Sequence, residues 1–268
     1  MYIDSHAHFD LTLEDGSITE DMLMDRTRAN SIVRAVQISI DTASSRWSRD
    51  FAKRHAEKGI LFTVGIHPSS PADDIELNEL NNLAEQIMSC DDSKLLFGIG
   101  ECGLDFYRKR QPVDTQERSF RFQIELANRL GLPVIVHSRE AMDQTLSILR
   151  EFCKTTGIMH CFPGDRNDAR RVLDLGFYLS FAGNVTYRNA ADMQASASYV
   201  PLERLLVETD APFLTPVPLR GKKNRPEYVV HTYRFIAGLR GEPEDRIAGT
   251  VYENFMELAN HEAKKVQI

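Results

Sequence analysis

The sequence lacks the features that mark membrane, fibrous or low-complexity proteins. No apolar run approaches the ~20 residues that cross a bilayer. The 15 glycines and 11 prolines among 268 residues are too few for a collagen-like or low-complexity chain. The four cysteines lie far apart and form no CxxC pair, so we expect a reduced cytosolic chain in which they pack as small hydrophobic residues.

Positive charge is also scarce. The chain has 32 Lys and Arg against 39 Asp and Glu, a net charge of −7. This balance argues against a protein that coats nucleic acid through bulk electrostatics, because phosphate neutralisation requires excess cations. It leaves open an enzyme that grips phosphate locally through metal ions. The first residues, Met1–Asp4, enter polar and acidic sequence without a basic and then apolar leader, so we expect a cytoplasmic protein with no membrane attachment.

Short runs rich in Val, Ile, Leu and Phe alternate with amphipathic stretches along the whole chain. Such runs are typical of parallel strands that are buried on both faces. Apolar residues recur at three- and four-residue steps in three intervening stretches, Thr115–Leu130, Ala141–Phe152 and Asp168–Leu175, which indicates helices. The predicted strands are Tyr2–His6, Arg34–Ile40, Leu61–Ile66, Leu95–Glu101, Pro133–His137, Gly157–His160, Phe177–Phe181 and Arg204–Glu208.

Eight strands, each followed by a plausible crossover, favour an α/β fold of the (β/α)8 TIM-barrel type for a chain of 268 residues. A doubly wound open sheet is the main alternative, because the same alternation of strands and helices produces it. No linker, repeat or charge block divides the chain. We therefore predict a single domain over residues 1–268.

Histidines and carboxylates stand at the ends of several predicted strands. His6 and His8 lie two apart in extended chain, so both imidazoles point to the same face and can converge on one ion. Glu101 ends an apolar strand, where a carboxylate is costly unless it is paired or coordinated. Each residue alone has an ordinary structural interpretation: a surface or capping histidine pair for His6 and His8, and an internal salt bridge for Glu101.

Three further strand ends carry a group that can bind metal. His137 and His160 each end a short apolar strand, where a histidine that merely bonds a backbone carbonyl is the alternative. Asp210 precedes Ala-Pro212, a common place for an Asx turn or helix cap. In a parallel barrel all these ends share one rim, where active sites are built. Four His, one Glu and one Asp suit two divalent ions that share a bridging carboxylate, with Zn, Mn, Fe, Co or Mg as candidates.

Motifs spread over nearly the whole chain resemble those of the TatD-like deoxyribonucleases, a branch of the amidohydrolase superfamily of metal-dependent barrel hydrolases. Two departures are mild: Cys102 replaces an isoleucine of the family pattern, and Leu11–Ile18 looks like a short insertion at the rim. The motifs are Asp4-Ser-His-Ala-His-Phe-Asp10, Val64-Gly-Ile-His-Pro68, Gly98-Ile-Gly-Glu-Cys-Gly-Leu-Asp105, Val136-His-Ser-Arg139, His160-Cys-Phe162, Glu208-Thr-Asp-Ala-Pro212 and Asn254.

The resemblance implies how the predicted metal ligands divide between two ions. His6, His8 and Asp210 would bind one ion, and His137 and His160 the other. Glu101 would bridge the pair, where other branches of the superfamily use a modified lysine.

Catalytic roles follow from this arrangement. Asp210 is our candidate to accept a proton from the attacking water, and Glu208 either orients the site or neutralises a buried arginine. His67 is assigned to the scissile phosphate or the leaving group, with a loop-bonding histidine as the alternative.

Four residues are predicted to bind substrate. Asp105 and Arg139 match family positions beside the ligands and at the phosphate, with an exposed salt bridge as the alternative for Arg139. Arg220 and Lys222 lie in the loop Pro216–Pro226, which also carries Lys223 and Arg225. A grip on the phosphate backbone is the preferred interpretation of this basic loop, since polyanions need local positive charge. Tyr107 with Phe106 could stack on a base or pack under the loop.

The function that the resemblance implies is a metal-dependent deoxyribonuclease with two divalent ions (Mg, Mn or Zn), acting as an exonuclease on single strands or frayed ends. Its expected partner is DNA, with RNA as an alternative. The sequence does not indicate whether the protein is a monomer or a weak oligomer. A hydrolase of a small cyclic amide, lactone or phosphotriester is the second hypothesis, which the basic loop disfavours. A non-catalytic module that binds nucleic acid or protein is the third, and the intact set of six candidate ligands weighs against it.

Overall fold

The computed structural model describes residues 1–260, over which strands and helices alternate. Residues 261–268 of the predicted single domain lie outside the described residues. The strands are β1 (Tyr2–Ala7), β2 (Ile32–Gln37), β3 (Ile60–Val64), β4 (Leu96–Asp105), β5 (Val134–Arg139), β6 (Gly157–Met159), β7 (Tyr178–Phe181) and β8 (Leu205–Val207).

Ten α-helices lie in the described part of the chain. They are α1 (Phe9–Leu13), α2 (Glu20–Ala29), α3 (Thr42–Arg54), α4 (Asp74–Met88), α5 (Val113–Leu130), α6 (Met142–Phe152), α7 (Arg166–Leu173), α8 (Ala191–Tyr199), α9 (Val229–Arg240) and α10 (Glu244–Ala259). Five short 3-10 helices are η1 (Ala56–Lys58), η2 (Asp91–Leu95), η3 (Gly183–Thr186), η4 (Leu202–Arg204) and η5 (Pro226–Tyr228). None of the helices in residues 1–260 combines the length and apolar character that a membrane span requires.

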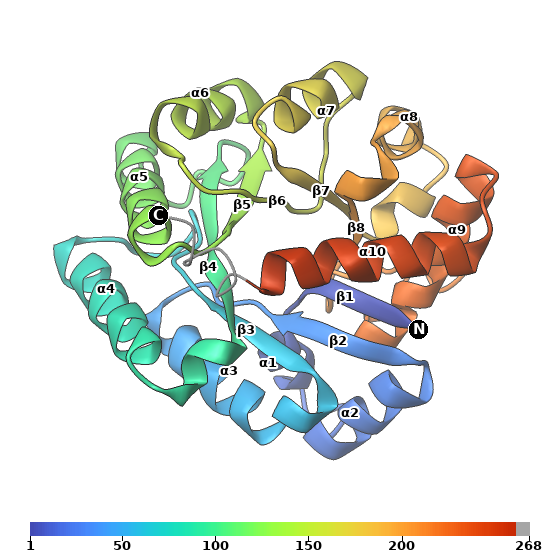
Figure 1. Cartoon of the computed structure of the whole chain (residues 1–268), viewed down its shortest axis with the longest axis horizontal. Coiled ribbons are helices and arrows are strands. Elements are labelled where there is room, and N and C mark those ends of the chain that lie inside the picture. The colour runs from blue at the N-terminus through green and yellow to red at the C-terminus, as the bar shows by residue number, and fades with distance from the viewer. Residues whose placement is uncertain (261–268) are drawn as a thin grey trace.

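The strands form one parallel sheet that curls into a barrel, with helices around it (Figure 1). Their spatial order is β1 through β8 in sequence, which confirms the predicted (β/α)8 barrel. A doubly wound sheet is excluded, because its strand order reverses part of the way along the sheet. The first and last strands meet just beyond β8: Asp210 N donates to His6 O (2.9 Å), and His8 N donates to Ala211 O (2.8 Å).

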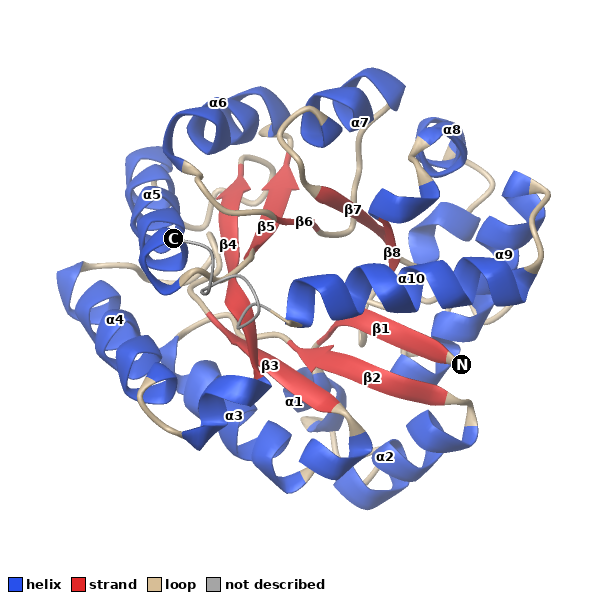
Figure 2. Ribbon diagram, in the orientation of Figure 1, coloured by secondary structure: helices blue, strands red, loops and turns tan. Residues whose placement is uncertain are grey.

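Apolar side chains explain both the strands and the ring of helices seen in Figure 2. Residues 134–136 of β5 are all fully buried, as expected of a strand covered on both faces. The helix α5 buries Phe120 and Ile124 and ends at Gly131, whose φ of 68° suits a glycine after a helix. The three predicted helices, now α5, α6 and α7, are confirmed, with starts that differ by one or two residues.

The last helix, α10, closes the amino-terminal end of the barrel. Phe255 stacks on Phe97 at the start of β4, with ring centroids 5.0 Å apart. Asn254 Nδ2 donates to Leu202 O (2.8 Å) and to Leu205 O (2.9 Å) at the start of β8. Asn254, one of the motif residues, therefore supports the end of the barrel opposite to the predicted site.

Two predicted boundaries are wrong in ways that matter for the site. The predicted strand Leu95–Glu101 continues to Asp105, so Glu101 lies inside β4. His137 likewise lies inside β5 and does not end it. The segment Leu11–Ile18, interpreted as an insertion at the rim, begins with the last residues of α1.

Candidate metal centre

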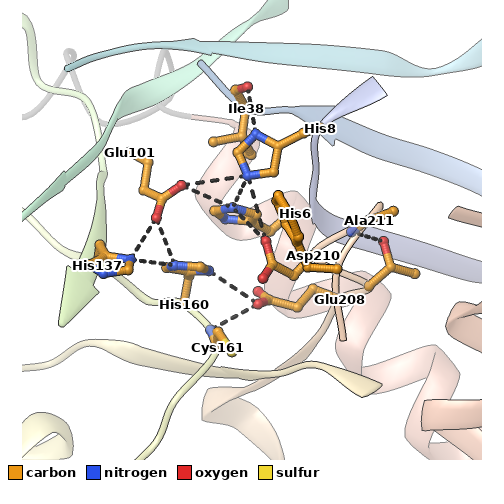
Figure 3. Close-up of polar contacts among 12 residues, drawn as sticks. His6, His8, Ile38, Glu101, His137, His160, Cys161, Glu208, Asp210 and Ala211 are labelled. Atoms are coloured by element: carbon orange, nitrogen blue, oxygen red, sulfur yellow. Dashed lines mark hydrogen bonds and ion pairs between the residues drawn. The ribbon is translucent and has the colours of Figure 1, made fainter. Parts of the chain in front are cut away.

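The six predicted metal ligands meet at the carboxyl end of the barrel (Figure 3). They come from β1, β4 and β5 and from the segments that follow β1, β6 and β8. Four of them are buried to an exposure of 5 % or less: His6, His8, Glu101 and His160. Groups this polar are costly to bury unless they satisfy one another or hold an ion.

The first cluster contains His6, His8, Asp210 and one oxygen of Glu101. The Nε2 atoms of His6 and His8 are 3.3 Å apart. His6 Nε2 lies 3.4 Å from Glu101 Oε2 and 3.7 Å from Asp210 Oδ1, and His8 Nε2 lies 3.7 Å and 3.5 Å from the same oxygens. A tetrahedral ion with ligand bonds of about 2.1 Å separates its ligand atoms by about 3.4 Å. The spacing of these four atoms therefore fits one divalent ion.

The second cluster surrounds the other oxygen of the same carboxylate. Glu101 Oε1 lies 2.8 Å from His137 Nδ1 and 3.0 Å from His160 Nε2. Those two nitrogens are 3.4 Å apart. Glu101 thus stands between two histidine pairs and presents one oxygen to each, as Figure 3 shows.

A bulge in β4 places Glu101 in this position. Between Ile99 and Cys102, β4 advances three residues while its partner β5 advances two, from Val134 to Val136. Bulges of this kind re-aim a side chain near active sites. Gly100 has a φ of 144°, and a Cβ on it would lie 2.5 Å from Ile135 O, so only glycine fits before the carboxylate.

Acceptors behind the histidines determine which ring nitrogen faces the centre. His8 Nδ1 donates to the carbonyl of Ile38 (3.2 Å), so Nε2 carries the lone pair whenever the ring is neutral. His160 Nδ1 faces Glu208 Oε1 at 3.3 Å, which leaves the lone pair on Nε2. The facing nitrogens of each histidine pair lie 3.3–3.4 Å apart, the separation expected of two ligands of one ion. The residues present therefore fit a bound metal.

Charge in the centre favours ionised carboxylates. Burial would raise the pKa of Glu101, but the surrounding histidines, His160 foremost, outweigh burial and hold that pKa well below its usual range. The pKa of Asp210 is lowered for the same reason, burial being outweighed by His8 and its neighbours. Burial also opposes protonation of His8, yet Asp210 and Glu101 raise its pKa to about 9. A cation that binds to His8 would therefore displace a proton from the ring.

Asp105 does not reach the surface where substrate was predicted to bind. It is 1 % exposed, and its Oδ2 lies 3.3 Å from His137 Nε2. Its Oδ1 accepts the backbone N–H of Arg108 at 2.7 Å. The Asp105 carboxylate can thus hold the proton of His137 on Nε2 and keep the lone pair on Nδ1. Asp105 thus lies beside the ligands, as its family position implies, and its role towards substrate stays a prediction.

Glu208 performs the same task behind His160. It is fully buried, and its Oε1 also accepts the backbone N–H of Cys161 at 2.8 Å. Of the two roles predicted for Glu208, the contacts match orientation of the site. The carbonyl of Ile38 was not predicted, because a backbone acceptor leaves no mark in the sequence.

His67 lies at the edge of the second cluster, but it presents an N–H group to the centre where the predicted ligands present a ring nitrogen that can bind metal. The backbone N–H of Ser69 donates to His67 Nδ1 at 3.0 Å, so the proton resides on Nε2. That Nε2–H lies 3.4 Å from Glu101 Oε1. Burial lowers the pKa of His67 to about 3. His67 is therefore a neutral hydrogen-bond donor at the centre.

Arg139 and Tyr107 form a stacked pair on the same rim. The Arg139 guanidinium lies over the Tyr107 ring, 3.9 Å from its centroid. Tyr107 is 59 % exposed, whereas Phe106 packs against the core. The alternative of a salt bridge for Arg139 finds no partner among residues 1–260. The pair presents both a cation and an aromatic ring to solvent.

The basic loop is divided between paired and free cations. Lys223 Nζ lies 2.7 Å from Asp15 Oδ2, and Arg225 lies 4.0 Å from Glu227. Arg220 and Lys222 are exposed and pair with no carboxylate in the described part of the chain. Arg220 stacks instead over Tyr187, 4.3 Å from the ring centroid. Only two of the four basic residues thus remain available to a ligand, and they are the two predicted to bind substrate.

Comparisons with known proteins agree with this geometry. The family model described as TatD related DNase matches residues 3–260. Among curated proteins, the chain is 37 % identical to the uncharacterized metal-dependent hydrolase YcfH of Escherichia coli K12, with 99 % of this chain and 98 % of that protein covered. It is 36 % identical to the uncharacterized metal-dependent hydrolase YabD of Bacillus subtilis, over 96 % and 98 % of the two chains. The crystal structure of YJJV, a TatD homolog from E. coli, matches with a TM-score of 0.86 and 27 % identity over 96 % of this chain and 97 % of that one.

Proposed function

The chain belongs to the TatD related DNase family of metal-dependent hydrolases, and from that premise we propose that it is a deoxyribonuclease with two divalent ions. The observation that carries the proposal is the position of Glu101. Its two carboxylate oxygens face separate histidine pairs, which is the arrangement of a bridging ligand. When bound, such a pair of ions activates water and offsets the charge of a phosphate.

The side chains around the centre have complementary roles in phosphodiester hydrolysis. Asp210 is ionised and more exposed than the other carboxylate, with a side-chain exposure of 13 % against 4 % for Glu101. It can accept the proton of a water molecule that attacks phosphorus. His67 offers its Nε2–H to a phosphate oxygen or the departing oxygen, and it stays neutral because burial lowers its pKa to about 3. Asp105 and Glu208 hold His137 and His160 in the tautomers that face the centre.

Local cations support a polyanionic substrate over a neutral ester. Arg220 and Lys222 are exposed on the loop that follows Asp210, in a chain whose net charge is −7. Arg139 adds a third cation beside β4. Positive charge concentrated at a site attracts a phosphate backbone even where the whole protein is acidic. We therefore propose DNA as the substrate, with the chain acting on single strands or frayed ends, and a cytoplasmic location, which the four free cysteines support.

The test is cleavage of end-labelled DNA by protein stripped with a chelator and reloaded with Mg, Mn or Zn. We expect single-stranded oligonucleotides to be shortened only after reloading. Glu101→Gln and His137→Ala are expected to remain folded and inactive, whereas Glu79→Gln, an exposed carboxylate on α4, should cleave as the wild type does. Reloaded protein that hydrolyses lactones or small phosphotriesters but leaves DNA and RNA intact would contradict the proposal.

A further inference from the structure

We propose that Phe213 forms a stacking site for an unpaired nucleobase next to the scissile phosphodiester. The inference rests on the proposed nuclease function. It narrows the substrate to nucleic acid in which the base next to the cleaved bond is unpaired. Phe213 was not singled out by the sequence, because a lone aromatic residue in a loop follows no periodic pattern.

Phe213 is an exposed aromatic side chain beside the metal centre. It is 47 % exposed although it is a large apolar residue. Its ring centroid lies 6.2 Å from that of His8, and the two rings meet edge to face at 71°. Phe213 is also three residues from Asp210, whose carbonyl accepts its N–H at 2.8 Å. A flat apolar surface thus lies about one nucleotide's size from a predicted metal ligand.

The turn that carries Phe213 is held in place by a buried side chain. Asn224 is fully buried, and its Nδ2 donates to Phe213 O (2.5 Å) and to Thr209 O (2.8 Å). Asn224 N donates in addition to Pro212 O at 3.1 Å. These contacts fix the backbone that carries the ring relative to Asp210. A backbone that is already fixed loses little conformational freedom when a ligand binds.

The surroundings of Phe213 suit a nucleotide better than another apolar ligand. The loop leads from Phe213 to the free cations Arg220 and Lys222, so a ring and a source of positive charge follow one another along the chain. The Tyr187 ring has a face occupied by Arg220, and the Tyr107 ring has one occupied by Arg139. Stacking on an aromatic ring is tolerant of sequence, because every base has a π face. A base inside a duplex is already paired and stacked on both faces, so an unpaired base is the better partner for this surface.

The experiment is a double-mutant cycle between protein and substrate. Wild type and Phe213→Ala are compared on a single-stranded oligonucleotide with all bases and on versions with an abasic nucleotide on the 5′ or 3′ side of the cleaved bond. We expect Phe213→Ala to lower kcat/KM on the complete oligonucleotide by about 5- to 150-fold, the range of one base–aromatic stack. One of the abasic substrates should lower the wild-type value by a similar factor, and Phe213→Ala should then have no further effect on it.

Two variants separate stacking from loss of structure. Phe213→Trp should retain the wild-type kcat/KM, because it keeps an aromatic face. Val217→Ala changes a residue of the same 47 % exposure in the same loop and should have no effect. Metal content of Phe213→Ala should equal that of the wild type. Equal losses on complete and abasic substrates, or no loss at all, would overturn the stacking site while the nuclease function stands. Absence of nucleic-acid cleavage by the wild type would overturn both.

Discussion

Asp105→Asn tests whether a buried carboxylate controls the protonation of His137. In the wild type, Asp105 Oδ1 is committed to the backbone N–H of Arg108, and Oδ2 faces His137 Nε2 at 3.3 Å. These two atoms face each other, and neither makes a hydrogen bond to any atom of residues 1–260. In the variant, the asparagine oxygen is needed by Arg108, so the NH2 group is turned towards His137. Two donors cannot face each other, and the ring therefore moves its proton to Nδ1.

The expected size of the effect follows from this change of tautomer. Nδ1 is the nitrogen that lies 2.8 Å from Glu101 Oε1 and 3.4 Å from His160 Nε2. A protonated Nδ1 cannot donate a lone pair to a cation. Loss of an outer partner of a metal-bound histidine costs about 10- to 100-fold in metal affinity or activity. We expect kcat and the affinity for Mn to fall by that factor, and KM for DNA to remain unchanged because Asp105 is buried.

The assay is competition of the stripped protein with a chelating dye for Mn, combined with steady-state cleavage of single-stranded DNA. Asp114→Asn is the matched control, because it makes the same change at an exposed position in the first turn of α5. A variant that binds Mn as tightly as the wild type but has a raised KM would refute this reasoning. It would support the substrate role that the sequence predicted for Asp105.

Three further predictions concern the loop, the acid response and the base of the barrel. Joint replacement of Arg220 and Lys222 by Ala should raise KM for single-stranded DNA and reduce the slope of log affinity against log salt by about 1.4; an unchanged slope would remove the loop from phosphate binding. Burial lowers the pKa of His67 from 6.5 to about 3, so below pH 6.5 the unfolded chain binds a proton that the folded chain refuses. In the chelator-treated wild type, this proton should lower the free energy of unfolding below pH 6.5 by up to about 1.4 kcal/mol per pH unit, and thermal melting should show that His67→Gln lacks this loss. Parallel curves of stability against pH for the two proteins would contradict the prediction. Asn254→Ala should lower the free energy of unfolding in urea by about 1–3 kcal/mol, because it removes the partner of two buried carbonyls, while the activity of folded protein is unaffected.

The barrel was predictable because buried strands have a simple signature. Runs such as residues 133–137 are almost wholly apolar and stand between amphipathic helices, and the structure places them at the predicted positions within a few residues. The bulge in β4 was not predictable in the same way. It depends on the close approach of Gly100 to Ile135 O, a contact between strands that the local sequence does not encode. For this reason Glu101 was expected at the end of its strand and lies inside it.

Side-chain types were easier to predict than their partners. The six candidate ligands could be chosen from residue type and from their positions near strand ends, and the structure brings them together. The partner of Asp105 was not predictable in the same way, because sequence spacing does not show which neighbour a carboxylate faces. The basic loop shows the same limit: Lys223 is neutralised by Asp15, far away in sequence, so the local density of charge overstated the number of free cations.

The predicted metal ligands lie on both sides of the junction between β8 and β1. His6 and His8 lie in and just after the first strand, and Asp210 follows the last strand. The Nε2 atoms of both histidines nevertheless lie within 3.7 Å of Asp210 Oδ1 across that junction. An ion held by these three side chains would tie together two parts of the chain that are separated by nearly all of its length. The ion would then stabilise the closed barrel in addition to its part in catalysis. Its binding would depend on the folding of all eight strands.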